Sequence, residues 1–166
     1  MKHKIIIIFL LFTLTIYGQD STKSKIPLKH FIGVGAGFTT GYGLSYRLIN
    51  NKYGVQFNFG PMSSQNQYTS ISSGVTLLYK LAELDVTNIY MYWGNHLYYR
   101  KDVYFHLSSH IKYYEKSTKW NTGLGIDLEL NKEKRLVFNI MFGLGGYDSF
   151  ITKTLTGEIG MHYRIN

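Results

Sequence analysis

The feature of this chain that most constrains its fold is an alternation of apolar and polar residues along nearly its whole length. In residues 120–131, WNTGLGIDLELN, every second residue is Trp, Thr, Leu or Ile, and the residues between them are Asn, Gly, Asp or Glu. Successive side chains of a β-strand point to opposite faces, so this period of two indicates a strand with one apolar and one polar face. The pattern leaves open which face is buried, because a water-soluble sheet buries the apolar face and a membrane barrel turns it toward lipid.

The same alternation recurs in eight segments, and no stretch after residue 29 shows a sustained helical period. Most segments are about ten residues long, which is the length that a tilted strand needs to cross a bilayer. The predicted strands are 30–39, 42–49, 52–61, 68–81, 85–99, 118–131, 135–147 and 153–165. Abundant Tyr, Phe and Gly, with Pro at only two positions, favour an all-β chain with tight turns.

The connectors between these segments alternate in length. Bacterial outer-membrane barrels have short turns at the periplasmic rim and longer loops at the external rim. The short connectors are 50–51, 82–84 and 132–134; on the other rim a brief one at 40–42 is joined by longer ones at 62–67, 100–117 and 148–152. Segment 103–114 also alternates, but a ninth strand would make the count odd, which single-chain bacterial barrels avoid. We therefore place it in a long external loop at about 100–117, as a hairpin above the membrane.

Two features favour a barrel whose apolar face meets lipid. The residues on the polar face of the predicted strands are mostly Gly, Ser and Asn. Such small residues suit a narrow eight-stranded interior better than a solvated sheet face. Aromatic residues of the apolar parity gather near strand ends, as in the interfacial girdles of membrane barrels. They are Tyr46, Tyr53, Tyr79, Tyr99, Trp120 and Tyr163. The alternative is an exported soluble sandwich or lipocalin-like barrel, in which the same rings would form the core.

The beginning of the chain predicts export. Residues 1–18 contain a basic start, an apolar run over 5–16 and a cut site after Gly18, which together form a signal peptide. The apolar run is too short to span a bilayer, which needs about 20 residues. We expect residues 19–29 to be a polar periplasmic leader and 30–166 to be the barrel.

Composition narrows the function further. The chain has no cysteine, which excludes disulfides, zinc–thiolate sites and thiol catalysis. The formal net charge is +8, and loss of the two lysines of the signal peptide leaves about +6 on the mature chain. That charge would suit anionic lipopolysaccharide, whereas its scattered distribution and the export signal argue against nucleic acid as a partner.

From residue 30 onward the chain resembles the small eight-stranded outer-membrane β-barrels of Gram-negative bacteria, the outer membrane protein A/X-like and porin-like superfamily. The resemblance is carried by the leader, the opening GVGAGF, the strand GLGIDLEL and the closing TLTGEIGMHYRIN. It implies an all-β, eight-stranded antiparallel up-and-down transmembrane β-barrel in the outer membrane, inserted by the barrel-insertion machinery and in contact with membrane lipids and lipopolysaccharide. Such barrels usually end in an aromatic residue, whereas this sequence ends in Asn166.

If the apolar face meets lipid, the charges of the opposite parity lie in the lumen. They are three bases, three acids and a histidine: Arg47, Lys80, Arg164, Asp127, Glu129, Glu158 and His162. Unpaired charges in a narrow lumen would be costly, whereas paired and hydrogen-bonded charges are tolerated. We therefore predict an internal ion-pair network that plugs the periplasmic half, and the alternative is an ion pathway.

One motif allows an enzymatic alternative. The pair His106 and Ser108, in FHLSSH, is similar to the lipid A 3-O-deacylase family, in which His and Ser act with a carboxylate. That family has its acid some dozen residues later, where this chain has Trp120, and the nearest acid, Glu115, is out of register. On a strand His106 and His110 would lie about 13 Å apart, too far to chelate one metal ion. We predict no enzyme, no metal and no cofactor, and keep His106, Ser108 and Glu115 as the weaker catalytic alternative.

The long loop is the better functional candidate because it is basic and rich in Tyr, which suits contacts with lipopolysaccharide or an extracellular partner. The residues expected to make these contacts are Arg100, Lys101, Tyr104, His106, His110, Lys112, Tyr113 and Tyr114. The sequence thus predicts a structural, adhesive or surface-interaction role with a narrow or plugged lumen. A small solute-permeable porin is the second possibility.

Overall fold

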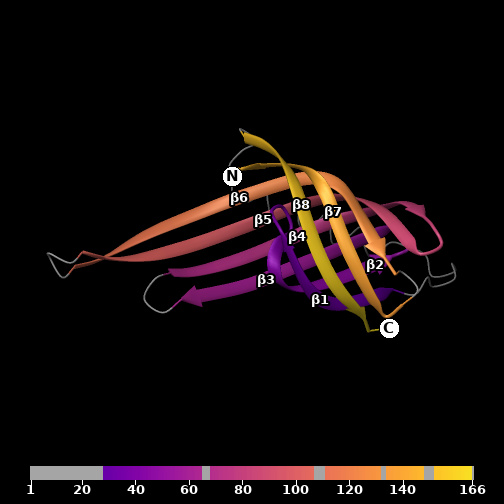
Figure 1. Ribbon diagram of the computed structural model, residues 1–166, viewed down its shortest axis with the longest axis horizontal. Coiled ribbons are helices and arrows are strands. Elements are labelled where there is room, and N and C mark those ends of the chain that lie inside the picture. Colours follow the sequence, from indigo (N-terminus) through magenta and orange to yellow (C-terminus); the bar gives the residue numbers. More distant parts are fainter. Residues whose placement is uncertain (1–27, 65–67, 107–110, 132–133, 148–151, 166) are drawn as a thin grey trace, which may run out of the picture.

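Eight strands close into a ring in the computed structural model, which describes residues 28–64, 68–106, 111–131, 134–147 and 152–165. The strands are β1 Lys29–Gly37, β2 Gly41–Asn50, β3 Tyr53–Ser64, β4 Tyr68–Glu83, β5 Thr87–His106, β6 Ile111–Leu130, β7 Leu136–Tyr147 and β8 Thr152–Arg164. Each strand pairs antiparallel with the next, and β8 pairs with β1 (Figure 1). The predicted all-β, eight-stranded antiparallel up-and-down barrel is confirmed. The predicted signal peptide and all but the end of the polar leader lie outside the described residues.

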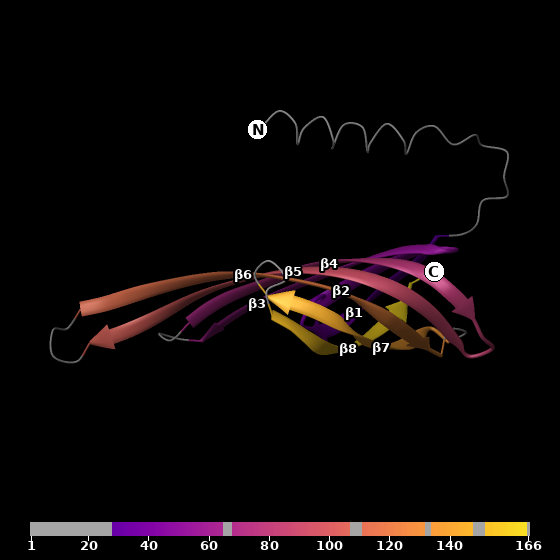
Figure 2. The same ribbon diagram turned by 90° about the horizontal axis from the view of Figure 1, so that it is seen from above.

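The strands are unequal in length, and this gives the molecule a protruding sheet. β5 and β6 pair over twenty positions, from Thr87 opposite Leu130 to His106 opposite Ile111. β7, however, pairs with β6 only from Asn121 inward, and β2 pairs with β3 only as far as Phe59. The outer ends of β3, β4, β5 and β6 therefore leave the ring as a four-stranded sheet, which extends to the left in Figures 1 and 2. Segment 103–114, placed in a loop on sequence grounds, continues β5 and β6 on either side of residues 107–110.

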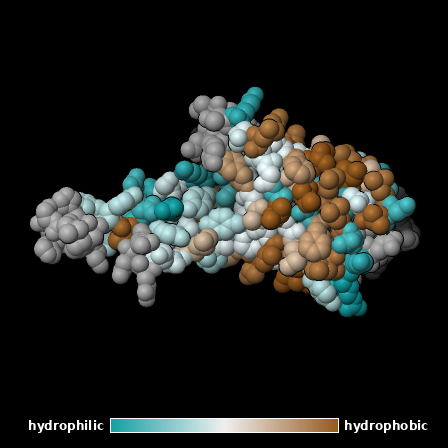
Figure 3. Space-filling model, in the orientation of Figure 1, coloured by the Kyte–Doolittle hydropathy of each residue, from teal (hydrophilic) through white to brown (hydrophobic). Residues whose placement is uncertain are grey.

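The apolar face of the barrel points outward. Leu124 is 54% exposed and Leu155 is 85% exposed, whereas Asp127 is fully buried inside the ring. Figure 3 shows the hydrophobic residues gathered over the barrel and the polar residues over the protruding sheet. A soluble protein seldom exposes a contiguous apolar surface of this extent. The opposite parity therefore fills the interior. Among the described residues, no helix is long and apolar enough to span a bilayer.

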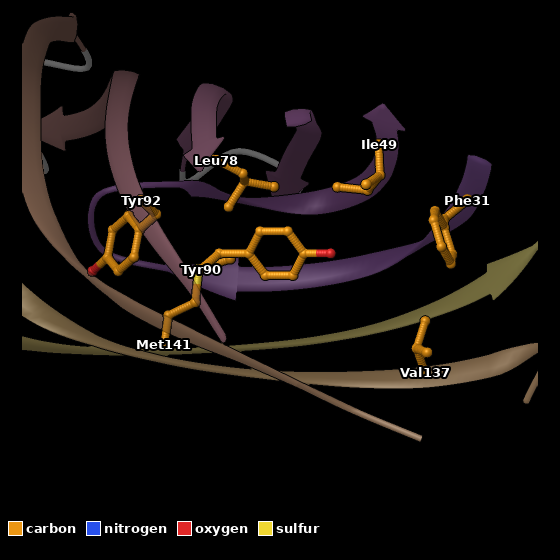
Figure 4. Packing of buried hydrophobic residues seen from close by; sticks show 7 residues of the cluster. All are labelled: Phe31, Ile49, Leu78, Tyr90, Tyr92, Val137 and Met141. Carbon is orange, nitrogen blue, oxygen red and sulfur yellow. The ribbon is translucent and has the colours of Figure 1, made fainter. Parts of the chain in front are cut away.

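The interior is packed and contains a small apolar layer. Its buried members are Phe31, Ile49, Leu78, Tyr90, Tyr92, Val137 and Met141. In Figure 4 the ring of Tyr90 lies in the middle of this layer, with Leu78 and Ile49 on one side and Met141 and Val137 on the other. Phe31, Ile49 and Val137 lie close to the rim where β1 begins and β8 ends, which we call the terminal rim. The barrel is thus filled by side chains there, as expected for eight strands.

Candidate functional site

A buried ion-pair cluster crosses the lumen between β2 and β6. Arg47 Nη2 lies 2.5 Å from Asp127 Oδ2 and 3.8 Å from Glu129 Oε2, and these three residues, here called the arginine cluster, are at most 3% exposed. The guanidinium also lies 5.2 Å from the ring centroid of Tyr90, and Asn88 donates to Glu129 at 2.7 Å. Each charge therefore has an opposite charge or a hydrogen bond, as buried charges require.

A chain of polar side chains extends the arginine cluster to β8. Asn139 donates to both carboxylate oxygens of Asp127, at 3.2 and 3.4 Å, so its own oxygen faces His162 Nδ1 at 2.9 Å. Because an amide oxygen can only accept, Nδ1 of His162 carries a hydrogen. In the neutral ring Nε2 then accepts from the Ser45 hydroxyl at 2.8 Å. These contacts link β2, β6, β7 and β8 across one level of the barrel.

The other predicted lumenal charges lie elsewhere. Lys80 forms an ion pair of 2.9 Å with Glu83 near the terminal rim. Arg164 donates to the Lys134 carbonyl at 3.3 Å, also at that rim. Glu158 is buried but faces a turn of the backbone, described next. The expected single network is therefore divided, and of the three predicted bases only Arg47 reaches the acids of the arginine cluster.

The turn between β1 and β2 folds into the lumen instead of projecting from the rim. In this inward turn, residues 38–41, Thr39 is fully buried and Thr40 is 2% exposed. Glu158 accepts from the backbone N–H of Thr39 at 3.0 Å and also from its hydroxyl. Gly41 has a φ of 80°, a left-handed conformation that favours glycine, and it lets the chain turn back into β2. The inward turn thus occupies the lumen above the arginine cluster.

Glycines of the polar parity make room for the inward turn. A Cβ on Gly74 would collide with the Thr40 carbonyl oxygen, and one on Gly94 would lie 2.7 Å from the Thr39 carbonyl oxygen. On the neighbouring strand β6, where Gly123 is the cross-strand partner of Gly94, a Cβ on Gly123 would lie 2.5 Å from the Thr39 methyl group. Real Cβ contacts are not this close, so side chains at these positions would expel the turn. The glycine-rich face seen in the sequence is therefore a seat for a backbone segment.

A Ser–His pair holds the inward turn. His96 Nδ1 lies 2.9 Å from the Phe38 carbonyl, which only accepts, so Nε2 is free to accept from the Ser72 hydroxyl at 3.0 Å. This is the hydrogen bond of a nucleophile and its base. Ser72, however, is fully buried, and its oxygen accepts from the backbone N–H of Tyr42 at 3.0 Å. Asn121 adds a second bond to the Phe38 carbonyl at 3.2 Å. The Ser72 hydroxyl is hydrogen-bonded to protein groups on both sides, so the Ser–His pair holds the backbone of the inward turn rather than acting as a nucleophile and base.

The protruding sheet carries cations stacked on aromatic rings. Arg100 donates to Asp102, at 2.9 and 3.0 Å from Nε, and lies 4.7 Å over the ring of Tyr68. The hydrogen bonds to Asp102 raise the pKa of Arg100. Lys101 lies on the opposite face, with Nζ 4.2 Å over the ring of Tyr114. Both faces of the sheet therefore combine positive charge with aromatic surface.

Further along this sheet, two exposed tyrosines face each other. Tyr104 and Tyr113 are cross-strand neighbours, and each is 52% exposed. The carboxylates of Asp102 and Glu115 raise the pKa of Tyr104, so its phenol stays a hydrogen-bond donor at neutral pH. The two rings form an exposed aromatic end to the sheet.

The residues of the weaker catalytic alternative are only partly described by the structure. Glu115 is exposed on β6, opposite Asp102, while His106 is placed only by its backbone, opposite Ile111. Ser108 and His110 lie outside the described residues, and of Lys112 only the backbone is described. No group of three metal-binding side chains occurs within the described ranges.

Comparison with known proteins identifies the fold. No protein-family model and no curated protein matches the chain. Among solved structures it is similar to a major outer membrane protein of Thermus thermophilus, with 14% identity, a TM-score of 0.51, and coverage of 84% of this chain and 100% of that one. The chain has the fold of a small outer-membrane β-barrel. It is also similar to the N-terminal barrel domain of Pseudomonas aeruginosa OprF (13% identity, TM-score 0.49, 86% and 100% covered) and to Ail of Yersinia pestis in a bilayer nanodisc (14%, 0.42, 84% and 100%).

Several residues of this barrel's lumen were not singled out by the sequence analysis. Thr39, His96 and Asn121 all contribute to the seat of the inward turn. The available signal was parity, since His96 and Asn121 fall on the polar face of their strands. No comparable signal exists for Thr39, because an uncharged turn residue looks the same whether its loop points out or in.

Proposed function

We propose that this protein is an outer-membrane barrel that acts as a surface-interaction protein through its protruding sheet. The observation that carries the proposal is the stacking of cations on aromatic rings on both faces of this sheet. Arg100 lies 4.7 Å over the ring of Tyr68 on one face, and Lys101 Nζ lies 4.2 Å over the ring of Tyr114 on the other. Positive charge beside aromatic surface suits contact with another protein.

The outward apolar belt supports residence in a membrane. Exposed aromatic rings lie toward both ends of the belt, with Trp120 60% exposed beside the protruding sheet and Tyr53 67% exposed near the terminal rim. Aromatic girdles of this kind mark the two interfaces of membrane barrels. Together with the predicted signal peptide, they favour the outer membrane, with the terminal rim on the periplasmic side.

A plugged lumen supports interaction over transport. The apolar layer, the arginine cluster and the inward turn together occupy the interior, and each joins different strands. A porin needs a continuous aqueous path, which stacked and hydrogen-bonded groups of this kind oppose. In this proposal the barrel anchors and orients the sheet.

The faces of the protruding sheet are matched to a particular kind of partner. Lys116 lies opposite Lys101 in the register, and Lys119 follows closer to the barrel on the same strand. A segment with acidic or aromatic side chains would gain charge or ring contacts from these faces.

Removal of the sheet's end tests the proposal. Because Lys101 and Lys116 are directly opposite, residues 102–115 can be replaced by Asn-Gly, which closes a two-residue hairpin at that point. Cells producing the full chain should attach to surfaces coated with serum and matrix proteins, and the shortened barrel should lose this attachment. Both should fractionate with the outer membrane and migrate anomalously on gels unless boiled. Equal attachment by a folded, shortened barrel would contradict the proposal.

A further inference from the structure

A groove crosses the outer wall of the barrel on the side where the ring closes. Its volume is about 610 Å³, within the range of ligand pockets, and it crosses β1, β8, β7 and β6. One side is the cross-strand row Val34, Met161, Phe138 and Leu130; the other is the row Ala36, Ile159 and Ile140. Its floor is the strand backbone between the rows, at Gly35, Gly160 and Asn139. The groove is thus a channel between two rows of apolar side chains.

Small outward residues explain why the wall is hollow here. Ala36 provides only a methyl group in a row whose other members are Ile159 and Ile140. At the next outward position of β8, Gly157, an added Cβ would meet no atom within 4 Å. These two positions therefore lower the outer surface along the side of the groove formed by Ala36, Ile159 and Ile140.

The mouth of the groove toward the terminal rim is amphipathic. The next outward residue of β8 is Tyr163, whose hydroxyl accepts from Arg135 Nη1 at 3.2 Å. Since that hydroxyl accepts from arginine, its hydrogen remains available for an oxygen acceptor of a ligand. Lys134 and Lys29 are also exposed at this rim, and the described residues 28–32, 134–136 and 163–165 contain no acid. An apolar channel therefore leads to a cluster of cations with a phenol between them.

We infer that this groove binds an anionic phospholipid. One acyl chain lies between the two rows, an ester oxygen accepts from Tyr163, and the headgroup phosphate is held by Arg135 and Lys134. Guanidinium and ammonium groups both suit phosphate oxygens, with charge-assisted hydrogen bonds from the former. The inference rests on the membrane orientation proposed above, which puts the terminal rim at the leaflet made of phospholipid.

Two substitutions separate the two halves of the site. Ala36→Phe fills the channel without changing the lumen, and Arg135→Gln removes the cation at the mouth. Matched controls are Leu44→Phe, an outward position on β2 that does not line the groove, and Lys52→Gln, a rim cation in the β2–β3 turn. Each folded full-length variant is released from detergent in native mass spectrometry after titration with phosphatidylglycerol or phosphatidylcholine.

The wild-type barrel should bind one phosphatidylglycerol about tenfold more tightly than phosphatidylcholine, as one charge-assisted contact provides. Ala36→Phe should lose at least about tenfold for both lipids, and Arg135→Gln should lose only the preference for phosphatidylglycerol. Both controls should bind like the wild type.

The inference is overturned if the wild type shows no preference, if Ala36→Phe binds like Leu44→Phe, or if the groove variants instead abolish a dimer of the chain. A wild-type chain that fractionates as a soluble protein would defeat the proposed function itself, whereas a barrel that inserts but binds lipid without these dependences defeats this inference alone.

Discussion

Replacing Arg47 with Met should destabilise the barrel strongly, because it removes the only cation of the arginine cluster. The guanidinium is fully buried and lies 2.5 Å from Asp127 and 3.8 Å from Glu129, so the variant leaves two buried carboxylates facing each other without it. Breaking a buried ion pair in this way costs about 3–5 kcal/mol. The double variant Arg47→Met/Asp127→Asn should recover part of that loss, since only Glu129 then remains charged and it keeps its bond from Asn88.

The assay is urea unfolding of the barrel in lipid vesicles, followed by tryptophan fluorescence and by the heat-dependent gel shift. Arg100→Met is the matched control, because it also breaks an Arg–Asp pair but on the protruding sheet, where the Arg100 side chain is 41% exposed. Exposed pairs contribute at most about 1 kcal/mol. Equal losses of unfolding free energy for Arg47→Met and Arg100→Met would refute the assignment of the polar face to a closed interior.

Other changes test the same architecture. Asp127→Lys should lower the unfolding free energy more than Glu115→Lys, because the first lies in the lumen and the second is exposed; equal losses would argue against the inside-out arrangement. Glu158→Ala removes both bonds that it accepts from the inward turn and should lower the unfolding free energy by about 1–3 kcal/mol in urea titration. An unchanged unfolding free energy would mean that the turn is held without this carboxylate. Gly74→Leu should cost about 1–3 kcal/mol in urea titration, since its side chain must displace the inward turn. Leu124→Arg places a charge on the middle of the outward belt and should cost about 2–4 kcal/mol in vesicles, whereas no loss would mean that this face is not in lipid.

The strands of the barrel and the direction of their side chains could be predicted from the sequence, because the alternation of side chains along a strand follows from covalent geometry. Alternating side-chain directions put Leu124 and Ile126 on one face and Asp127 on the other whatever the rest of the chain does. Eight such segments of membrane-spanning length, with the glycine-rich parity turned inward, were then enough to predict the closed antiparallel ring.

Contacts across the lumen could not be read in the same way, because they depend on depth along each strand. Lys80 and Arg47 share the lumenal parity, yet the register between β4 and β5 shifts between Lys80 and Ala82, close to where Lys80 pairs with Glu83 at the rim. A bulge of this kind changes the direction of a side chain, and it cannot be recognised in the alternation of apolar and polar residues. The inward turn was likewise hidden, since the carboxylate that holds Thr39 lies 119 residues away in the chain.

The inward turn also has a consequence for how the ring is sealed during assembly. β1 and β8 share six cross-strand pairs, the last of them Ala36 opposite Ile159, against twenty pairs between β5 and β6. Just beyond that last pair, the two bonds from Thr39 to Glu158 continue the junction with side-chain chemistry. The joint with the greatest sequence separation, and hence the slowest to find its partner, is therefore also the shortest. A single carboxylate on the final strand therefore joins the closing seam of the barrel to the turn that fills its lumen, so the same residue contributes to both.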